Sequence, residues 1–150
     1  MHIDYATPVS YLDSDTVQTW ADVALRHGTA PISDAEICVR IVDESEMTEL
    51  NSRFRDKHYP TNVLSFPADL PEGIEDSFIG DIAICAPVVE REALEQCKDK
   101  TAHWAHMVVH GCLHLVGMDH ERDEEAADME ETEIQILADL GFANPYTLDQ

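Results

Sequence analysis

Three histidines, His110, His114 and His120, stand in one short segment with the spacing of a catalytic metal site. His110 and His114 are four residues apart, so a helix places both imidazoles on one face, about one turn apart. Gly117 can end that helix in a left-handed conformation, which lets the chain turn back and bring His120 to the same ion. Three neutral nitrogens leave a fourth tetrahedral position for water, so the segment predicts one catalytic Zn²⁺ per chain.

The same spacing occurs in a zinc-protease pattern, His-Glu-x-x-His-x-x-Gly-x-x-His, with one difference. The protease has a glutamate directly after the first histidine as its general base. Here that position is Gly111, which has no side chain. We therefore expect metal-assisted chemistry on a substrate other than a peptide, or a base supplied from elsewhere in the chain. Two partly exposed helix histidines without a metal are the simpler alternative.

Two further histidines, His103 and His106, precede His110 on the same predicted helical stripe. They could contact a ligand histidine or the substrate, or they could be polar residues near the rim of the cleft. Asp119 is next to His120, where its carboxylate could orient the imidazole of a metal ligand. It could equally cap the following helix.

The charge of the chain argues against general nucleic-acid binding, because 31 Asp and Glu residues against 9 Lys and Arg give a net charge of −22. Yet Arg53, Arg55 and Lys57 fall close together, beside His58. One local cationic patch can still bind RNA. Arg55 is the best candidate for a phosphate contact, because a guanidinium presents planar donors that suit phosphate oxygens. A surface arginine in a helix-end ion pair is the alternative.

Length and composition predict a single domain, residues 1–150, without internal repeats. The apolar stretch around residues 107–118 is interrupted by histidines and too short to span a bilayer. The first residues lack the features of a secretory signal. We therefore expect a cytoplasmic protein with no membrane partner. The cysteines form no C-x-x-C pair, and we expect reduced thiols at Cys38, Cys85, Cys97 and Cys112.

Other catalytic and cofactor motifs are missing from the sequence. It contains neither a GxxxxGK loop nor a GxGxxG fingerprint, so no nucleotide cofactor is expected. Ser65 is not part of a G-x-S-x-G elbow, which disfavours a serine hydrolase.

Hydrophobic periodicity, caps and breakers predict the elements that must position these residues. We expect an α+β domain in which a small mixed sheet of about four strands packs with about five or six helices. The central helix begins at Thr101 and carries His110 and His114. The predicted strands cover residues 2–6, 36–42, 63–66 and 79–85, and the other helices run from 13 or 15 to 26, 43 to 55, 87 to 97 and 124 to 140, with a surface loop over 71–77.

Two of these helices carry specific expectations. The helix capped at Asp43 should turn Met47, Leu50 and Phe54 inward and present Arg55 at its end. The last helix should pack through an apolar side, and its many acidic residues should form a solvated face. The residues expected on that apolar side are Met129, Ile136, Leu137 and Leu140.

Several blocks of the chain together resemble the YbeY family of bacterial endoribonucleases and ribosomal-RNA maturation factors. The segment from His110 to His120 resembles the family's H-G-x-L-H-L-x-G-x-D-H. Residues 61–67 resemble its T-D-V-L-S-F-P, residues 80–82 resemble its G-D-I, and residues 50–55 resemble its L-N-x-x-x-R. In order and spacing, the resemblance covers the chain roughly from residue 37 to the C-terminus.

This resemblance implies a zinc-binding α+β domain with the ligands His110, His114 and His120. It makes Arg55 the functional arginine, so the surface ion pair becomes the weaker interpretation. Arg53 and Lys57, its neighbours in the local cationic patch, are expected to bind RNA with it. The resemblance further implies single-strand-specific cleavage in the 3′-end maturation of small-subunit (16S) ribosomal RNA and in ribosome quality control. The implied partners are ribosomal RNA and the small ribosomal subunit with its proteins.

The chain departs from the family pattern at two positions. Asn62 stands where an aspartate is common, which puts in doubt any role that needs a carboxylate there. Met118 replaces a frequent tyrosine, a smaller change because an apolar contact can be kept.

The expected reaction is metal-assisted cleavage of an RNA phosphodiester. The ion would lower the pKa of bound water to about 7, or would polarise a phosphoryl oxygen while the ribose 2′-OH attacks. Arg55 would stabilise charge on the phosphoryl oxygens. The sequence leaves both nucleophiles open, and a 2′,3′-cyclic phosphate product would indicate the 2′-OH. Two other functions remain as alternatives: a zinc hydrolase of non-RNA substrates, and a non-catalytic ribosome-assembly factor with a structural zinc.

Overall fold

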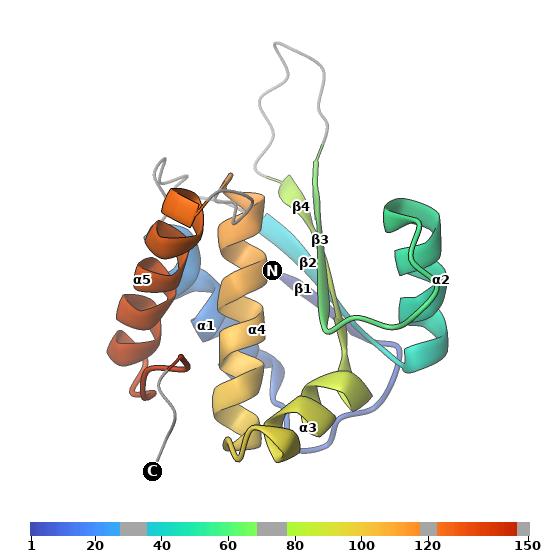
Figure 1. The fold of residues 1–150 in the computed structure, drawn as a ribbon, viewed down its shortest axis with the longest axis horizontal. Helices are drawn as coiled ribbons and strands as arrows, with labels where there is room; N and C mark the ends of the chain where they lie inside the picture. Colours follow the sequence, from blue (N-terminus) through green and yellow to red (C-terminus); the bar gives the residue numbers. More distant parts are fainter. Residues whose placement is uncertain (28–35, 69–77, 118–122, 147–150) are drawn as a thin grey trace.

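The computed structural model describes residues 1–27, 36–68, 78–117 and 123–146, and the predicted α+β fold class is confirmed (Figure 1). The predicted loop over residues 71–77 lies outside the described residues. In chain order the elements are β1 (His2–Tyr5), α1 (Ser14–Arg26), β2 (Glu36–Val42), α2 (Glu44–Arg55), β3 (Val63–Pro67), β4 (Phe78–Cys85), α3 (Ala86–Glu95), α4 (Lys100–Leu115) and α5 (Asp123–Asp139).

The strands form one four-stranded mixed sheet, as predicted, and their order is β1-β2-β4-β3. β2 pairs in parallel with β1 and β4, whereas β3 runs antiparallel to β4. β3 is therefore an edge strand, and its Ser65 lies opposite Ile82 of β4. In Figure 1, β3 stands between α4 on one side and α2 on the other.

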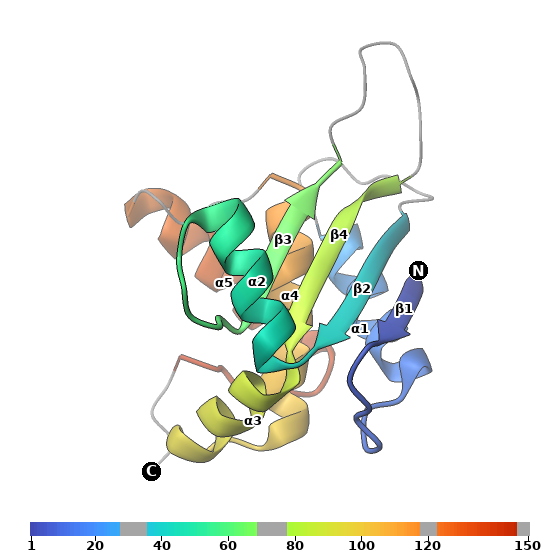
Figure 2. The same ribbon diagram turned by 90° about the vertical axis from the view of Figure 1, so that its right-hand side faces the viewer.

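Helices cover both faces of the sheet. Figure 2 shows α2 in front of the strands, with α1, α4 and α5 behind them. Ile82 and Ile84 of β4 belong to the larger core, which includes α4. Ala83 belongs to the smaller core together with Met47 of α2. Successive strand residues point to opposite faces, so β4 is buried on both sides and its mostly apolar sequence follows from that.

The central helix α4 is largely buried, as its apolar residues on several sides predict. Trp104 and Leu113 have no exposed surface. The helix begins after Asp99, whose side chain accepts a hydrogen bond from the Thr101 N–H at 2.8 Å and satisfies a free donor of the first turn. Asp43 caps α2 in the same way, as predicted.

One packing prediction is wrong. Phe54 was expected to point inward with Met47 and Leu50, but it is 55% exposed. It lies in the last turn of α2, away from the buried Met47, and its ring meets Phe66 of the edge strand edge-on, with 5.0 Å between the centroids. The helical stripe is regular, but the smaller core does not extend far enough to cover its last position.

Within the described ranges, no helix combines the length and the apolar character that crossing a membrane would need.

Gly111 packs α4 closely against the sheet. A Cβ atom at this position would lie 2.9 Å from Cγ2 of Ile82 and 3.3 Å from Cγ2 of Val63. The absence of a side chain therefore has a packing reason, and a glutamate, the protease's general base, would collide with the sheet.

This contact predicts whether a side chain at position 111 raises or lowers the free energy of unfolding. In an open helix, Gly→Ala stabilises by about 1 kcal/mol. We expect Gly111→Ala to lower the free energy of unfolding by about 1–3 kcal/mol, because the methyl group overpacks the interface with Ile82. Urea denaturation measures the change. An increase in stability would mean that α4 does not lie this close to the sheet.

Candidate active site

His110 and His114 converge in the C-terminal half of α4. Their Nε2 atoms are 3.1 Å apart, and the ring centroids are 4.7 Å apart. Two nitrogens bound to one tetrahedral zinc at about 2.0–2.1 Å lie about 3.3 Å from each other. Of the three predicted ligands, the two that lie in the described residues therefore have a spacing that fits one shared zinc ion.

The backbone between the two histidines is fixed to the sheet. The Ser65 hydroxyl of β3 donates to the Gly111 carbonyl at 3.0 Å, and both residues are buried. Together with the close packing of Gly111, this bond sets the rotation of α4 about its axis. The histidines on either side are thus aimed by the helix–sheet contact.

The other ring nitrogen of His110 contacts Glu133 of α5, with 2.5 Å between Nδ1 and Oε1. The second carboxylate oxygen lies 3.1 Å from Nε2 of His106 and accepts a hydrogen bond from the Tyr146 hydroxyl. An ionised carboxylate can only accept, so the proton of neutral His110 belongs on Nδ1 and the Nε2 lone pair faces His114. A carboxylate behind a ligand histidine is the usual support of a zinc site.

Glu133 was missed by the sequence analysis, which placed the acidic residues of the last helix on a solvated face. That expectation is wrong for this residue, which has no exposed surface. Its spacing could have revealed it, because Glu133 follows Met129 by four residues and precedes Ile136 and Leu137 by three and four. All three are buried, so the acid lies on the packing side of α5.

Burial opposes the ionisation of Glu133, but the hydrogen bonds with His106 and His110 outweigh it and lower the pKa of Glu133 to about 2. Burial and the bonded carboxylate raise the pKa of the Tyr146 phenol well above its usual value. The carboxylate is therefore charged and the phenol neutral at physiological pH. The network is held together by a buried anion with three polar partners.

His103 forms a second buried pair on α4, with Nε2 3.0 Å from Oε1 of Glu92. The Asn62 amide donates to the same carboxylate at 3.2 Å. The hydrogen bond from His103 is the main reason that the pKa of Glu92 is lowered, although burial opposes it and Asn62 assists. An aspartate at position 62 could not donate to Glu92. Asn62, the residue that departs from the family pattern, therefore has a hydrogen-bond partner in this chain, Glu92.

Of the two alternatives for His103 and His106, the structure does not support a position near the rim of the cleft. They are 3% and 7% exposed, respectively, and each contacts a carboxylate. Of the two, His106 shares Glu133 with His110 and so belongs to the network behind the candidate ligand.

Arg53, Arg55 and Lys57 lie at and just after the C-terminal end of α2, all exposed. α2 covers the opposite face of the sheet from α4, and no hydrogen bond or ion pair in the described part of the chain joins Arg55 to either histidine. The C-terminal ends of α2 and α4 nevertheless lie at the same end of the molecule, on either side of β3 (Figure 1). Nη2 of Arg53 lies 3.9 Å from Oε1 of Glu49. The ion pair that the sequence left open for Arg55 at the end of this helix is therefore made by Arg53.

The remaining predicted site residues, His120 and Asp119, lie outside the described residues, as does Met118. Their placement relative to His110 and His114 stays a prediction.

The family model and the curated relatives agree on one family. The family described as Endoribonuclease YbeY matches residues 3–141. Curated relatives of that name include one from Pseudomonas putida, 51% identical over 98% of this chain and 90% of its own length. Another, from Stutzerimonas stutzeri, is 54% identical over 89% of this chain and 82% of its own. The solution structure of TM1509 from Thermotoga maritima shares the fold, with a TM-score of 0.59 and 24% identity over 97% of this chain and 98% of that one.

The buried carboxylate generates a prediction about stability. Glu133→Gln keeps the size of the side chain but replaces one acceptor oxygen by a donor that faces the donors of His106, His110 or Tyr146. We expect the free energy of unfolding to fall by about 2–3 kcal/mol in urea denaturation. Glu131→Gln, on the exposed side of the same helix, is the matched control and should change it by less than about 0.5 kcal/mol. Equal, small changes would mean that Glu133 is not a buried acceptor.

Proposed function

Since the chain belongs to the endoribonuclease YbeY family, and is thus an endoribonuclease of ribosomal-RNA processing, we propose that it cleaves single-stranded RNA with one zinc ion. The ligands are His110, His114 and His120. The substrate is the 3′ end of small-subunit (16S) ribosomal RNA, and the same activity serves ribosome quality control. Its partners are the small ribosomal subunit and its proteins, in the cytoplasm.

The observation that carries the proposal is the convergence of His110 and His114, with the Glu133 carboxylate behind His110. When bound, zinc supplies Lewis acidity and a nucleophile at neutral pH. The protein residues hold and orient the ligand imidazoles. Glu133 keeps the His110 proton on Nδ1, and Asp119 acts in the same way on His120.

Arg55 is the residue we assign to the phosphoryl oxygens. Its guanidinium is exposed at the last residue of α2 and has no ion-pair partner among the described residues, so it is available to an anionic substrate. As negative charge builds on the phosphoryl oxygens, planar donors stabilise the transition state more than the ground state. Arg53 and Lys57 add sequence-independent attraction for the RNA backbone.

A zinc peptidase is the weaker alternative. Its general base would stand at position 111, where Ile82 and Val63 leave no room for a side chain. Turnover of RNA but not of a peptide panel by the zinc-loaded protein separates the two functions. The ends of the RNA products distinguish attack by water from attack by the 2′-OH.

The zinc assignment predicts metal content. The purified protein should contain about one zinc per chain by elemental analysis, and His114→Ala should lose most of it. A chelator should lower the melting temperature of the wild type, because an ion that binds only the native state adds to its stability. His58→Ala removes an exposed histidine of the loop after α2 and should keep full occupancy. Full occupancy in His114→Ala would place the metal elsewhere.

The assignment of Arg55 predicts a loss of rate without a loss of structure. Arg55→Ala should leave zinc content and melting temperature near wild type, because the side chain is exposed. Cleavage of a single-stranded RNA should fall by about two orders of magnitude or more, the scale of removing one transition-state donor. Arg55→Lys should recover only part of the rate.

Lys57→Ala is the control for this substitution, since it removes one neighbouring charge. It should weaken RNA binding mainly at low salt, where a phosphate contact counts most, and leave the maximal rate close to wild type. Equal, small losses for Arg55→Ala and Lys57→Ala would reduce Arg55 to one member of a diffuse cationic patch.

A further inference from the structure

Phe54 is a large apolar ring that the fold leaves in solvent. It is 55% exposed, and its described ring contact is the edge-on one with Phe66, 5.0 Å between centroids. Leaving an aromatic ring uncovered forgoes the stabilisation that its burial would give. Tyr59, five residues further on, is also 55% exposed. Phe54 and Tyr59 are thus two exposed aromatic rings within one six-residue segment.

The segment that carries these rings is ordered by its own hydrogen bonds. α2 ends at Asp56, which adopts a left-handed conformation with φ of 56° and turns the chain back. The buried Asn51 then fixes the loop that follows. Its backbone carbonyl accepts a hydrogen bond from the Lys57 N–H at 3.2 Å, and its side-chain amide donates to the Tyr59 carbonyl at 2.8 Å. The surface is therefore preformed, which lowers the entropic cost of binding.

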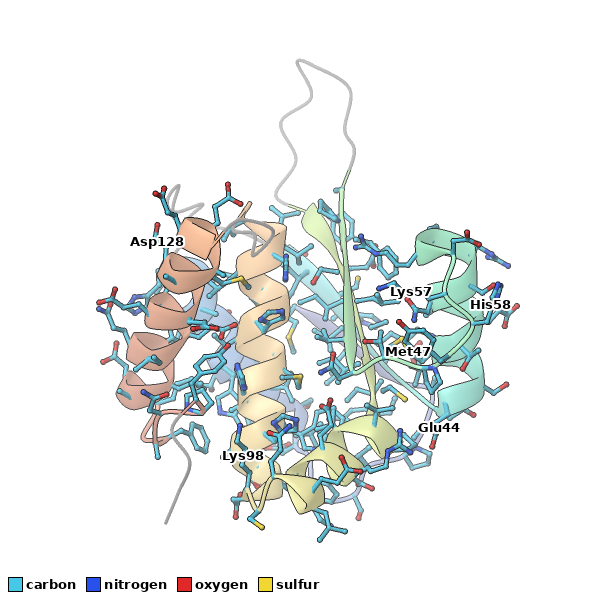
Figure 3. All side chains as sticks on the ribbon, viewed as in Figure 1. Glu44, Met47, Lys57, His58, Lys98 and Asp128 are labelled. Atoms are coloured by element: carbon cyan, nitrogen blue, oxygen red, sulfur yellow. The ribbon has the colours of Figure 1, made fainter. Side chains whose placement is uncertain are left out.

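The same segment holds three of the nine lysines and arginines of a chain whose net charge is −22. Arg55 and Lys57 have no ion pair among the described residues, unlike Arg40 and Arg91, which pair with carboxylates. Figure 3 shows Lys57 on the side of the loop toward β3 and His58 on the outer side. Exposed rings and free cations thus occur together.

We propose that Phe54, with Phe66 behind it and Tyr59 beside it in the chain, is a stacking platform for the unpaired bases of the RNA substrate. The cations Arg53, Arg55 and Lys57 hold the phosphates on either side of the stacked base. Aromatic rings combined with a cationic groove are how proteins bind single strands without reading sequence. In a duplex the bases are stacked on each other and unavailable, so the platform selects single-stranded RNA.

The platform lies across the edge strand from the candidate metal ligands. Phe66 follows Ser65, whose hydroxyl bonds the Gly111 carbonyl next to His110. Adjacent residues of a strand point to opposite faces, so the strand that positions α4 on one face presents Phe66 to Phe54 on the other. This inference rests on the proposed function, because it assigns a subsite to the same RNA substrate.

The test separates base stacking from phosphate binding. Affinity is measured by fluorescence anisotropy of the zinc-loaded protein for a twelve-nucleotide single-stranded DNA, which lacks the 2′-OH, and for an abasic strand of the same length and charge. Phe54→Ala should weaken binding of the base-containing strand by about tenfold and leave the abasic strand unchanged. Lys57→Ala should weaken both strands by a similar factor and reduce the salt slope by about 0.7.

Phe54→Leu is the matched control for folding, because it keeps an apolar contact with Phe66 but has no ring to stack. It should keep the wild-type melting temperature and lose the same base-dependent affinity, whereas Phe54→Trp should retain it. Two results would contradict the platform: unchanged affinity of Phe54→Leu for the base-containing strand, or an equal loss of affinity for the base-containing and abasic strands. Either result would leave the ring as a contact for a protein. Cleavage of RNA by the wild type is assayed separately. Cleavage without base-dependent binding contradicts the stacking platform and leaves the proposed function standing. Base-dependent binding without cleavage contradicts the proposed function and leaves the platform standing.

Discussion

Helix α4 rests on the sheet through Gly111, and the geometry of the candidate site follows from that contact. Without a side chain at this position, the helix backbone reaches Ile82 and Val63, and the Gly111 carbonyl reaches the Ser65 hydroxyl. A helix held this closely cannot roll about its axis without breaking packing on the sheet. The residues before and after Gly111 are therefore directed by the sheet, and His110 and His114 point to a common place.

The same burial explains why acidic residues stand behind the histidines. α4 is covered on nearly all sides, so each polar side chain that it turns inward needs a partner. Glu133 is the hydrogen-bond partner of His106 and His110, and Glu92 is the partner of His103. A neutral partner could satisfy one hydrogen bond, but a carboxylate accepts from several donors and fixes which ring nitrogen carries the proton. In Glu133, one side chain thus meets the packing requirement of α4 and defines the tautomer of the candidate ligand His110.

What the sequence predicted depends on whether an interaction is local. The convergence of His110 and His114 follows from the period of one helix, and the mixed sheet follows from the strand patterns. The contact between Glu133 and His110 joins two helices, so helical periodicity within α4 could not reveal it. Phe54 fits its helical stripe but lies beyond the smaller core, and the reach of a core is a property of the whole fold. The third ligand position, His120, lies outside the described residues and stays a prediction.

The strong negative charge of the chain limits how it can hold RNA. Helix α5, whose exposed acids include Glu124, Asp128 and Glu130, lies on the far side of α4 from α2 (Figure 1). Long-range repulsion weakens every contact that depends on phosphates alone, and few cations are available to offset it. Stacking on an aromatic ring is far less sensitive to that charge, and it requires an unpaired base. In the binding mode that we propose, a small cationic patch joined to exposed rings favours single strands over duplex, since a duplex offers phosphates but no free base.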